Sequence, residues 1–143
     1  GREIYISILG NRRLEAFAPW ELFSEQNRED GQMIATSQVK HNVAYRKKHG
    51  ITSDFAKNIS EEMTKKLDRI AKRVYRLLCL SGYARIDFRL RADGTPYVLE
   101  ANPNPEISDY EDFAMAAYHG GYEYEELIEK LIRLAIQRPD DLL

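Results

Sequence analysis

The chain has 143 residues, of which 21 are basic and 23 acidic, and its formal net charge at neutral pH is −2. This balance excludes the bulk positive charge with which proteins hold nucleic acid or anionic membranes, so we expect neither as a partner. The single cysteine, Cys79, excludes a disulfide framework and a zinc cluster, and its helix-like surroundings predict a small core residue.

The length suits one domain over residues 1–143, which would bury roughly two-thirds of its unfolded surface. No apolar run approaches the roughly 18 residues of a membrane span, and no signal-peptide pattern opens the chain, so we expect a cytoplasmic protein. The first residue is Gly1 and a strand-like pattern begins almost at once, which is typical of a piece of a longer protein.

Two extended runs open the chain. Residues 3–9 alternate, and Gly10-Asn11 turns the chain into a second run through Phe17, so we predict two antiparallel strands. The next segments are, in order, an irregular stretch or short strand at 19–23, a polar loop at 27–32, a short strand at 33–36 and a basic loop at 37–51. The three histidines, His41, His49 and His119, are expected at the surface.

A long amphipathic helix comes next. Asn58 with Glu61 three residues later predicts a capping box at its start, and Ser81-Gly82 predicts its end. Apolar residues recur every three or four positions, so one face should pack on a sheet. These inward positions are Met63, Leu67, Ile70, Ala71, Val74, Leu77 and Leu78.

The central feature is a hairpin formed by residues 83–90 and 97–102, which both alternate between apolar and polar positions. Asp93-Gly94 predicts a two-residue type I′ turn, in which Ala92 faces Thr95. Counting outward from that turn places Asp87 opposite Glu100 and Arg85 opposite Asn102.

Two opposed carboxylates about 5 Å apart repel each other unless a cation lies between them. Asp87, Glu100 and Asn102 offer the hard oxygen ligands that suit Mg²⁺ or Mn²⁺, and Arg85 could hold an anion beside the metal. The alternative is a solvated outer face, in which Asp87 pairs with Arg85 or Arg89 and Glu100 pairs with a lysine from elsewhere.

The remaining residues predict a stiff loop and two helices. Two prolines keep 102–107 extended, and Ser108 with Glu111 predicts a capping box for a helix that passes Ala117 and stops at Gly120-Gly121. A last helix should run from about Tyr124 to Ile136, end at Pro139, and turn Leu127, Ile128, Leu131, Leu134 and Ala135 inward. The expected fold is α+β: a mostly antiparallel sheet covered on one face by the three helices.

Three segments together resemble the ATP-grasp superfamily, and specifically its D-alanine–D-alanine ligase-like branch. They read Gly82-Tyr83-Ala84-Arg85-Ile86-Asp87-Phe88, Asp93-Gly94 and Tyr97-Val98-Leu99-Glu100-Ala101-Asn102-Pro103. Gly1-Arg2-Glu3 and Lys40 also match that branch in order and approximate spacing. The resemblance covers nearly the whole chain but only the C-terminal subdomain of an ATP-grasp enzyme, so the N-terminal half would be a missing partner.

The resemblance implies an enzyme that phosphorylates a carboxylate with ATP and lets an amine displace phosphate from the acyl phosphate. It assigns two Mg²⁺ ions to Asp87, Glu100 and Asn102. Arg85 would stabilise charge on the substrate carboxylate and the tetrahedral intermediate. Glu3 would accept hydrogen bonds from the ribose and Lys40 would reach the terminal phosphate. Glu3 could instead be a solvated strand residue, and another position of the basic loop could be the true counterpart of Lys40.

One departure from the family pattern concerns the substrate. Where D-alanine ligases carry a small Ser-Pro-Gly loop, this chain has Pro103-Asn104-Pro105-Glu106, and a glutamate does not permit the same close backbone approach. We therefore expect Asn104, Glu106 and Ser108 to face the substrate and set a specificity other than D-alanine, such as an amine that Glu106 pairs.

Other identities stay open at this level. The chain could belong to another ATP-grasp branch, such as a glutamate-tail ligase or a biotin-carboxylase-like enzyme, or be a non-catalytic nucleotide-binding module. A homodimer of the full-length form is also open. Because the phosphate-gripping lysines of the first subdomain lie upstream of Gly1 in the family, the isolated piece should have little ligase activity.

Overall fold

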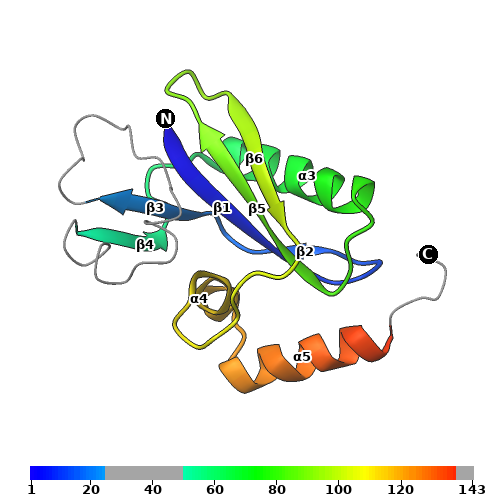
Figure 1. Cartoon of the computed structure of the whole chain (residues 1–143). Coiled ribbons are helices and arrows are strands. Elements are labelled where there is room, and N and C mark those ends of the chain that lie inside the picture. The colour runs from blue at the N-terminus through cyan, green and yellow to red at the C-terminus, as the bar shows by residue number, and fades with distance from the viewer. Residues whose placement is uncertain (25–49, 138–143) are drawn as a thin grey trace.

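The computed structural model describes residues 1–24 and 50–137 and shows an α+β fold built on an antiparallel sheet (Figure 1). The strands are β1 (Arg2–Leu9), β2 (Glu15–Ala16), β3 (Trp20–Ser24), β4 (Ile51–Phe55), β5 (Tyr83–Leu90) and β6 (Pro96–Asn102). The helices are α3 (Glu61–Leu77), α4 (Asp112–His119) and α5 (Tyr124–Ile136). The expected fold class is confirmed. The predictions for 27–32, for 33–36, for most of the basic loop and for Pro139 lie outside the described residues.

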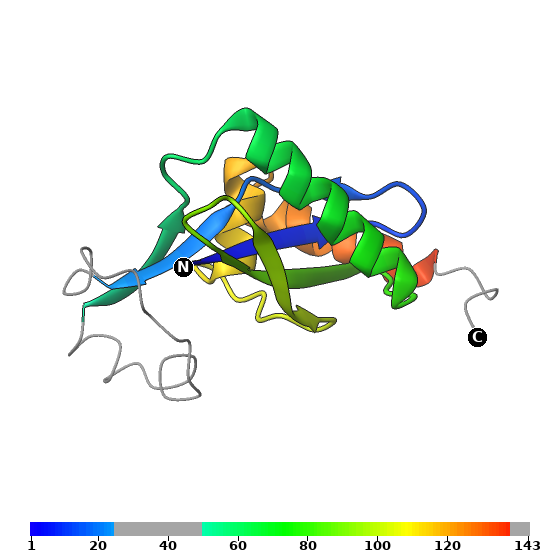
Figure 2. The ribbon, with the colours of Figure 1, turned by 90° about the horizontal axis from the view of Figure 1, so that it is seen from above.

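The sheet has helices on both faces, so the prediction that all three cover one face is wrong (Figure 2). Its strand order is β4-β3-β1-β5-β6, with β2 paired to β1. One face of β1 carries Ile4, Ile6 and Ile8, which pack with α3 in one core cluster. The other face carries Tyr5 and Leu9, which pack with α4 and α5 in a second cluster. Because β1 is apolar on both faces, each face needs its own cover.

The first two predicted strands form as expected, with Ile8 paired to Ala16. The ambiguous stretch at 19–23 is a true strand, β3, which pairs with β1 on one side and β4 on the other. β4 was not predicted, and its first residue, Ile51, was placed in the basic loop. Its centre, Thr52 to Asp54, is polar and lacks the apolar alternation by which a strand is recognised, because β4 is an edge strand.

The long helix begins and ends at other residues than predicted. The N-cap is Ser60, whose hydroxyl accepts the Met63 N–H, whereas Asn58 lies upstream with φ of 57°. Leu67 and Ala71 are fully buried as expected, but Leu77 and Leu78 are 70% and 54% exposed. The apolar face therefore ends one turn earlier than the sequence pattern suggested.

The C-terminus of α3 is a Schellman motif rather than the predicted Ser81-Gly82 stop. The Leu80 N–H bonds to the Tyr75 carbonyl and the Cys79 N–H to the Arg76 carbonyl. Cys79 occupies the left-handed position with φ of 52° and is exposed, so its assignment to the core is wrong.

The hairpin pairs Asp87 with Glu100 and Arg85 with Asn102 as predicted, but its turn differs from the prediction. Arg91 rather than Ala92 faces Thr95, because the loop has three residues with only Gly94 at positive φ, 79°. The longer loop shifts the register by one, and a bulge between Asp87 and Phe88, where Leu99 is the extra residue, shifts it back. The two departures cancel.

The last two helices are where the sequence placed them. α5 spans the predicted residues and carries a capping box between Glu123 and Glu126, although Ala135 is exposed rather than inward. The capping box predicted for α4 is wrong, since its N-cap is Glu111 without a side-chain hydrogen bond. His119 at the end of α4 is exposed as expected, and its ring lies against Phe55 and Trp20. Among the described helices, none is long and apolar enough to cross a membrane.

Candidate functional site

A strip of polar and charged side chains crosses β1, β5 and β6 on the face that α4 and α5 cover. The register places Glu3 opposite Arg89, Tyr5 opposite Asp87, and Ser7 opposite Arg85. β6 continues the last two rows with Glu100 opposite Asp87 and Asn102 opposite Arg85. We call Glu3, Arg85, Asp87, Arg89, Glu100 and Asn102 the polar strip. The pairing that the sequence predicted for the four residues of the hairpin is confirmed.

The centre of the polar strip is a two-point contact between Arg85 and Asp87. This is the pairing that the sequence offered as the alternative to a cation, although Asp87 is buried rather than solvated. The Arg85 Nε and Nη2 groups donate to the two Asp87 carboxylate oxygens at 2.8 and 3.0 Å, and Asp87 is only 1% exposed. Beneath the guanidinium lies the Tyr5 ring, whose centroid is 4.3 Å from Arg85 Cζ. Burial by itself lowers the Arg85 pKa, but the hydrogen bonds and charge of Asp87 outweigh it and raise the pKa, so the guanidinium stays charged.

A second carboxylate approaches the far edge of the same guanidinium. Asp112, the first residue of α4, places Oδ2 3.8 Å from Arg85 Nη1, and its Oδ1 accepts a hydrogen bond from the Ser53 hydroxyl of β4. Arg85 is therefore held by residues from three elements, with Asp87 on its own strand, Tyr5 on β1 and Asp112 on α4.

Glu3 is buried in the neighbouring row. Its carboxylate accepts the Tyr5 hydroxyl at 3.0 Å and Arg89 Nη2 at 2.9 Å, and the residue is 3% exposed. Burial, followed by the negative charge of Glu3, raises the Tyr5 pKa, so this phenol remains a hydrogen-bond donor. The alternative in which Glu3 is a solvated strand residue therefore does not hold.

The oxygen donors proposed for a cation lie next to one another on β5 and β6. Asp87 is buried, Glu100 opposite it is exposed, and the Asn102 side-chain oxygen accepts the Asn104 N–H at 3.0 Å. Carboxylate oxygens and the amide oxygen of an asparagine are all hard ligands. The donor chemistry thus fits a hard divalent cation. The described residues contain no group of three His, Cys, Asp or Glu side chains arranged to bind a metal, so the amide of Asn102 is needed.

The predicted substrate loop leads from the end of β6 towards α4. The Tyr83 hydroxyl donates to the Asn104 side-chain oxygen at 2.7 Å, which ties the loop to the start of β5. Glu106 accepts the Ser108 hydroxyl and N–H at 2.5 and 3.0 Å, and these hydrogen bonds lower the Glu106 pKa. Asn104, Glu106 and Ser108 are all exposed, so an ionised Glu106 faces solvent at the end of the polar strip.

Sequence reasoning missed three side chains of this site. Tyr5 shares a strand face with Glu3, so the alternation of β1 could have included it. Asp112 approaches Arg85 and bonds Ser53 only because α4 crosses over the sheet, and no local pattern encodes these contacts. Lys40, the predicted phosphate contact, lies outside the described residues.

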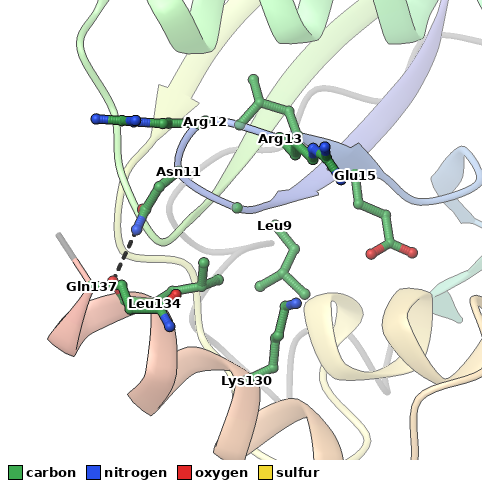
Figure 3. Close-up of a pocket in the computed structure, with 10 residues that line it drawn as sticks. Leu9, Asn11, Arg12, Arg13, Glu15, Lys130, Leu134 and Gln137 are labelled. Carbon is green, nitrogen blue, oxygen red and sulfur yellow. Dashed lines mark hydrogen bonds between the residues drawn. The ribbon is translucent and has the colours of Figure 1, made fainter. Parts of the chain in front are cut away.

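A separate pocket of about 590 Å³ lies between the turn after β1 and the last turns of α5 (Figure 3). Leu9 and Leu134 form its apolar base, and Asn11 crosses it by donating to the Leu134 carbonyl at 2.9 Å. Arg12 extends away from this base. The lining contains none of the residues predicted for the site.

Three comparisons with known proteins agree. A family model described as D-ala D-ala ligase C-terminus matches residues 1–133. The D-alanine–D-alanine ligase of Bacillus cytotoxicus is 33% identical over 142 residues, covering 96% of this chain and 35% of that protein. The corresponding ligase of Geobacillus thermodenitrificans is 42% identical over 81 residues, which are 57% of this chain and 22% of that protein.

The fold is also shared with a solved structure. The D-alanine–D-alanine ligase from Coxiella burnetii matches with a TM-score of 0.73 at 25% identity, covering 95% of this chain and 32% of that one. The chain thus spans about a third or less of the length of these relatives.

Proposed function

Because this chain belongs to the D-ala D-ala ligase C-terminus family, we propose that it is the C-terminal part of an ATP-dependent ligase that joins a carboxylate to an amine through an acyl phosphate. The curated relatives carry the name of such a ligase. The observation that carries the proposal is the Arg85–Asp87 contact, a buried charged fork in the middle of a sheet. Burying two charges is costly, and a purely structural sheet would often be at least as stable with apolar residues there.

Arg85 is suited to binding an oxyanion. Asp87 and Tyr5 fix the plane of its guanidinium before any substrate arrives, so no reorganisation is needed when negative charge develops. In this role Arg85 would stabilise the charge on the substrate carboxylate as it is phosphorylated and then on the tetrahedral intermediate that the amine forms. The buried setting strengthens these interactions because the local dielectric is low.

Asp87, Glu100 and Asn102 would hold Mg²⁺, two ions by resemblance, whose charge offsets that of the ATP phosphates. Glu3 and Lys40 are proposed as nucleotide contacts, Glu3 to the ribose and Lys40 to the terminal phosphate. The Glu3 carboxylate is already oriented by Tyr5 and Arg89, which supports a role that requires a fixed acceptor.

The experiment is a phosphate-release assay on the full-length protein with ATP, Mg²⁺ and pairs of amino acids. Arg85→Lys keeps the charge but removes the fork, and should lower substrate-dependent phosphate release by about 100-fold or more. Arg91→Lys is the matched control, because Arg91 lies on the same hairpin with its side chain 58% exposed. Absence of ATP-dependent product with any carboxylate and amine would overturn the proposal.

We also propose that Glu106 contributes to substrate choice. Its pKa is lowered by Ser108, so it carries a negative charge at neutral pH and can pair a substrate ammonium group. In the full-length protein, Glu106→Gly should shift the preferred amine substrate towards D-alanine, measured as the ratio of kcat/KM values. An unchanged preference would remove Glu106 from the specificity determinants.

The isolated 143-residue chain should have little ligase activity, because it spans only about a third of its relatives. Adding the N-terminal part of the protein in trans is then expected to restore phosphate release in proportion to complex formation. Robust ATP-dependent phosphate release by the isolated chain would contradict this expectation.

A further inference from the structure

Asp112 connects three elements that are not neighbours in sequence. It lies at the first position of α4, yet its side chain is only 17% exposed and turns towards the sheet. One carboxylate oxygen accepts the Ser53 hydroxyl of β4 and the other approaches Arg85 of β5. In the sheet, β4 and β5 are separated by β3 and β1, so this carboxylate spans strands that do not touch.

The contact complements the one made by Asp87. Asp87 accepts hydrogen bonds from Nε and Nη2 of Arg85. Asp112 faces the third nitrogen, Nη1, which does not bond to Asp87. The 3.8 Å separation is too long for a hydrogen bond, so the attraction is between charges. Ser53 fixes the direction of the Asp112 carboxylate, as a hydrogen-bonded support does for a charged group in a site.

An acidic residue in the first turn of a helix also interacts favourably with the helix dipole. That effect does not require the side chain to turn inward. Asp109, three residues earlier, faces solvent, and its carboxylate accepts the neighbouring Tyr110 N–H at 3.0 Å. The inward direction of Asp112 therefore needs another cause, and the hydrogen bond from Ser53 together with the charge of Arg85 supplies it.

We propose that Asp112, supported by Ser53, is a positioning residue that holds the Arg85 guanidinium in the orientation its oxyanion-binding role requires. This inference rests on the proposed function and assigns to α4 a direct part in the geometry of the site. A misplacement of about 1 Å in a catalytic group can cost about 100-fold in rate, so a residue that restrains one edge of Arg85 should act mainly on kcat.

The test uses the full-length protein, three variants of the Asp112–Ser53 pair and one control variant. Asp112→Asn keeps the oxygen that Ser53 bonds but removes the charge, and should lower kcat about tenfold with the KM for ATP changed less than twofold. Asp112→Glu restores the charge and should recover most of the loss. Ser53→Ala should give a smaller decrease in the same direction. Asp109→Asn is the matched control and should leave kcat unchanged.

A double-mutant cycle decides whether Asp112 acts through Arg85. In an Arg85→Lys background, Asp112→Asn should lower kcat by less than twofold, because the group it restrains is gone. The same tenfold loss in both backgrounds would overturn the inference, and so would a decrease in thermal stability with unchanged kcat.

A spectroscopic readout separates this inference from the proposed function. The Arg85 Nε–H resonance of ¹⁵N-labelled protein, assigned by its loss in Arg85→Lys, should shift and broaden in Asp112→Asn but not in Asp109→Asn. An unchanged resonance overturns the positioning role even in an active enzyme. A protein without ligase activity whose resonance does respond would overturn the proposed function alone.

Discussion

Charged residues inside the sheet are kept there by specific partners. Glu3 and Asp87 are 3% and 1% exposed, and each carboxylate faces an arginine on β5. An ionised carboxylate in such a place is stable only while its partner remains, because removing one member leaves a buried charge. The two arginines therefore bear on stability as well as on chemistry.

Arg89→Met tests this at the Glu3 pair. Since the Arg89 side chain is 21% exposed, the loss should lie near the lower end for a buried pair, a decrease of about 3 kcal/mol in the free energy of unfolding. The measurement is urea denaturation, with Arg91→Met as the exposed control. Adding Glu3→Gln should recover part of the loss, and failure to recover would show that the charge of Glu3 is not the cause.

Cys79 is a residue whose backbone conformation costs stability. Its φ of 52° is in the left-handed region, where a Cβ is unfavourable by roughly 1–2 kcal/mol. Cys79→Gly should therefore raise the free energy of unfolding by about 1 kcal/mol, whereas Cys79→Ala should not. Equal stabilities of the two variants would contradict this assignment.

At the level of single elements, the start of α3 gives a clear prediction. Ser60 caps the helix by accepting the Met63 N–H, so Ser60→Ala should cost about 1 kcal/mol in the free energy of unfolding. Asn58→Gly, which removes the residue that the sequence favoured as the cap, should be neutral or slightly stabilising because φ there is 57°. A larger loss at Asn58 than at Ser60 would reverse the assignment.

The hairpin shows what alternation can and cannot predict. The polar faces of 83–90 and 97–102 were enough to pair Asp87 with Glu100, because a slip of one residue would have buried charges under α3. The Asp93-Gly94 signal was not enough to define the loop, since a three-residue turn also uses Gly94 at positive φ. The bulge has no local sequence signal, and only the pairing demanded by the buried face fixes it.

Deletions in β6 should test whether the bulge at Leu99 offsets the register shift that the three-residue loop introduces. Removing Leu99 deletes the extra residue of the bulge and keeps Glu100 opposite Asp87, so the free energy of unfolding should change by no more than about 1 kcal/mol. Removing Ala101 instead moves Glu100 or Asn102 towards the α3 face and should cost at least about 2 kcal/mol. Similar losses for both deletions, measured by urea denaturation, would argue against the observed bulge.

At the scale of the whole molecule, two buried tyrosines make the free energy of unfolding depend on pH in the alkaline range. Burial raises the pKa of Tyr5 and of Tyr75, whose hydroxyl donates to the Gly10 carbonyl at 2.8 Å. Above about pH 10 these tyrosines lose protons in the unfolded chain but keep them in the folded one. The stability they contribute is complete below that pH and is lost as pH rises.

Each tyrosine should lower the free energy of unfolding by up to about 1.4 kcal/mol per pH unit above pH 10. Tyr75→Phe removes one of the two contributions and should make the decline shallower. Urea midpoints at pH 9, 10 and 11 measure it. A decline of the same steepness in Tyr75→Phe would exclude Tyr75 as a source.

The arrangement of layers was the part of the fold that the sequence predicted least well. Residues of β1 alternate between Ile and Tyr, Ser or Leu, so both faces are apolar enough to need a cover, but the pattern does not say which helix covers which face. The contacts of Asp112 with Arg85 and with Ser53 depend on that choice. The hairpin residues of the site were therefore predictable from the chain, and the residues that support Arg85 from α4 and β4 were not.

The place of β1 in the sheet bears on how the protein is made. β1 leaves the ribosome before β5, with which one of its edges pairs and whose last residue is Leu90. At about 5–20 residues per second, translation needs several seconds to deliver that partner. During this interval the edge that β5 will cover and the isoleucines of β1 are exposed on the nascent chain, which gives a chaperone reason to bind this short segment.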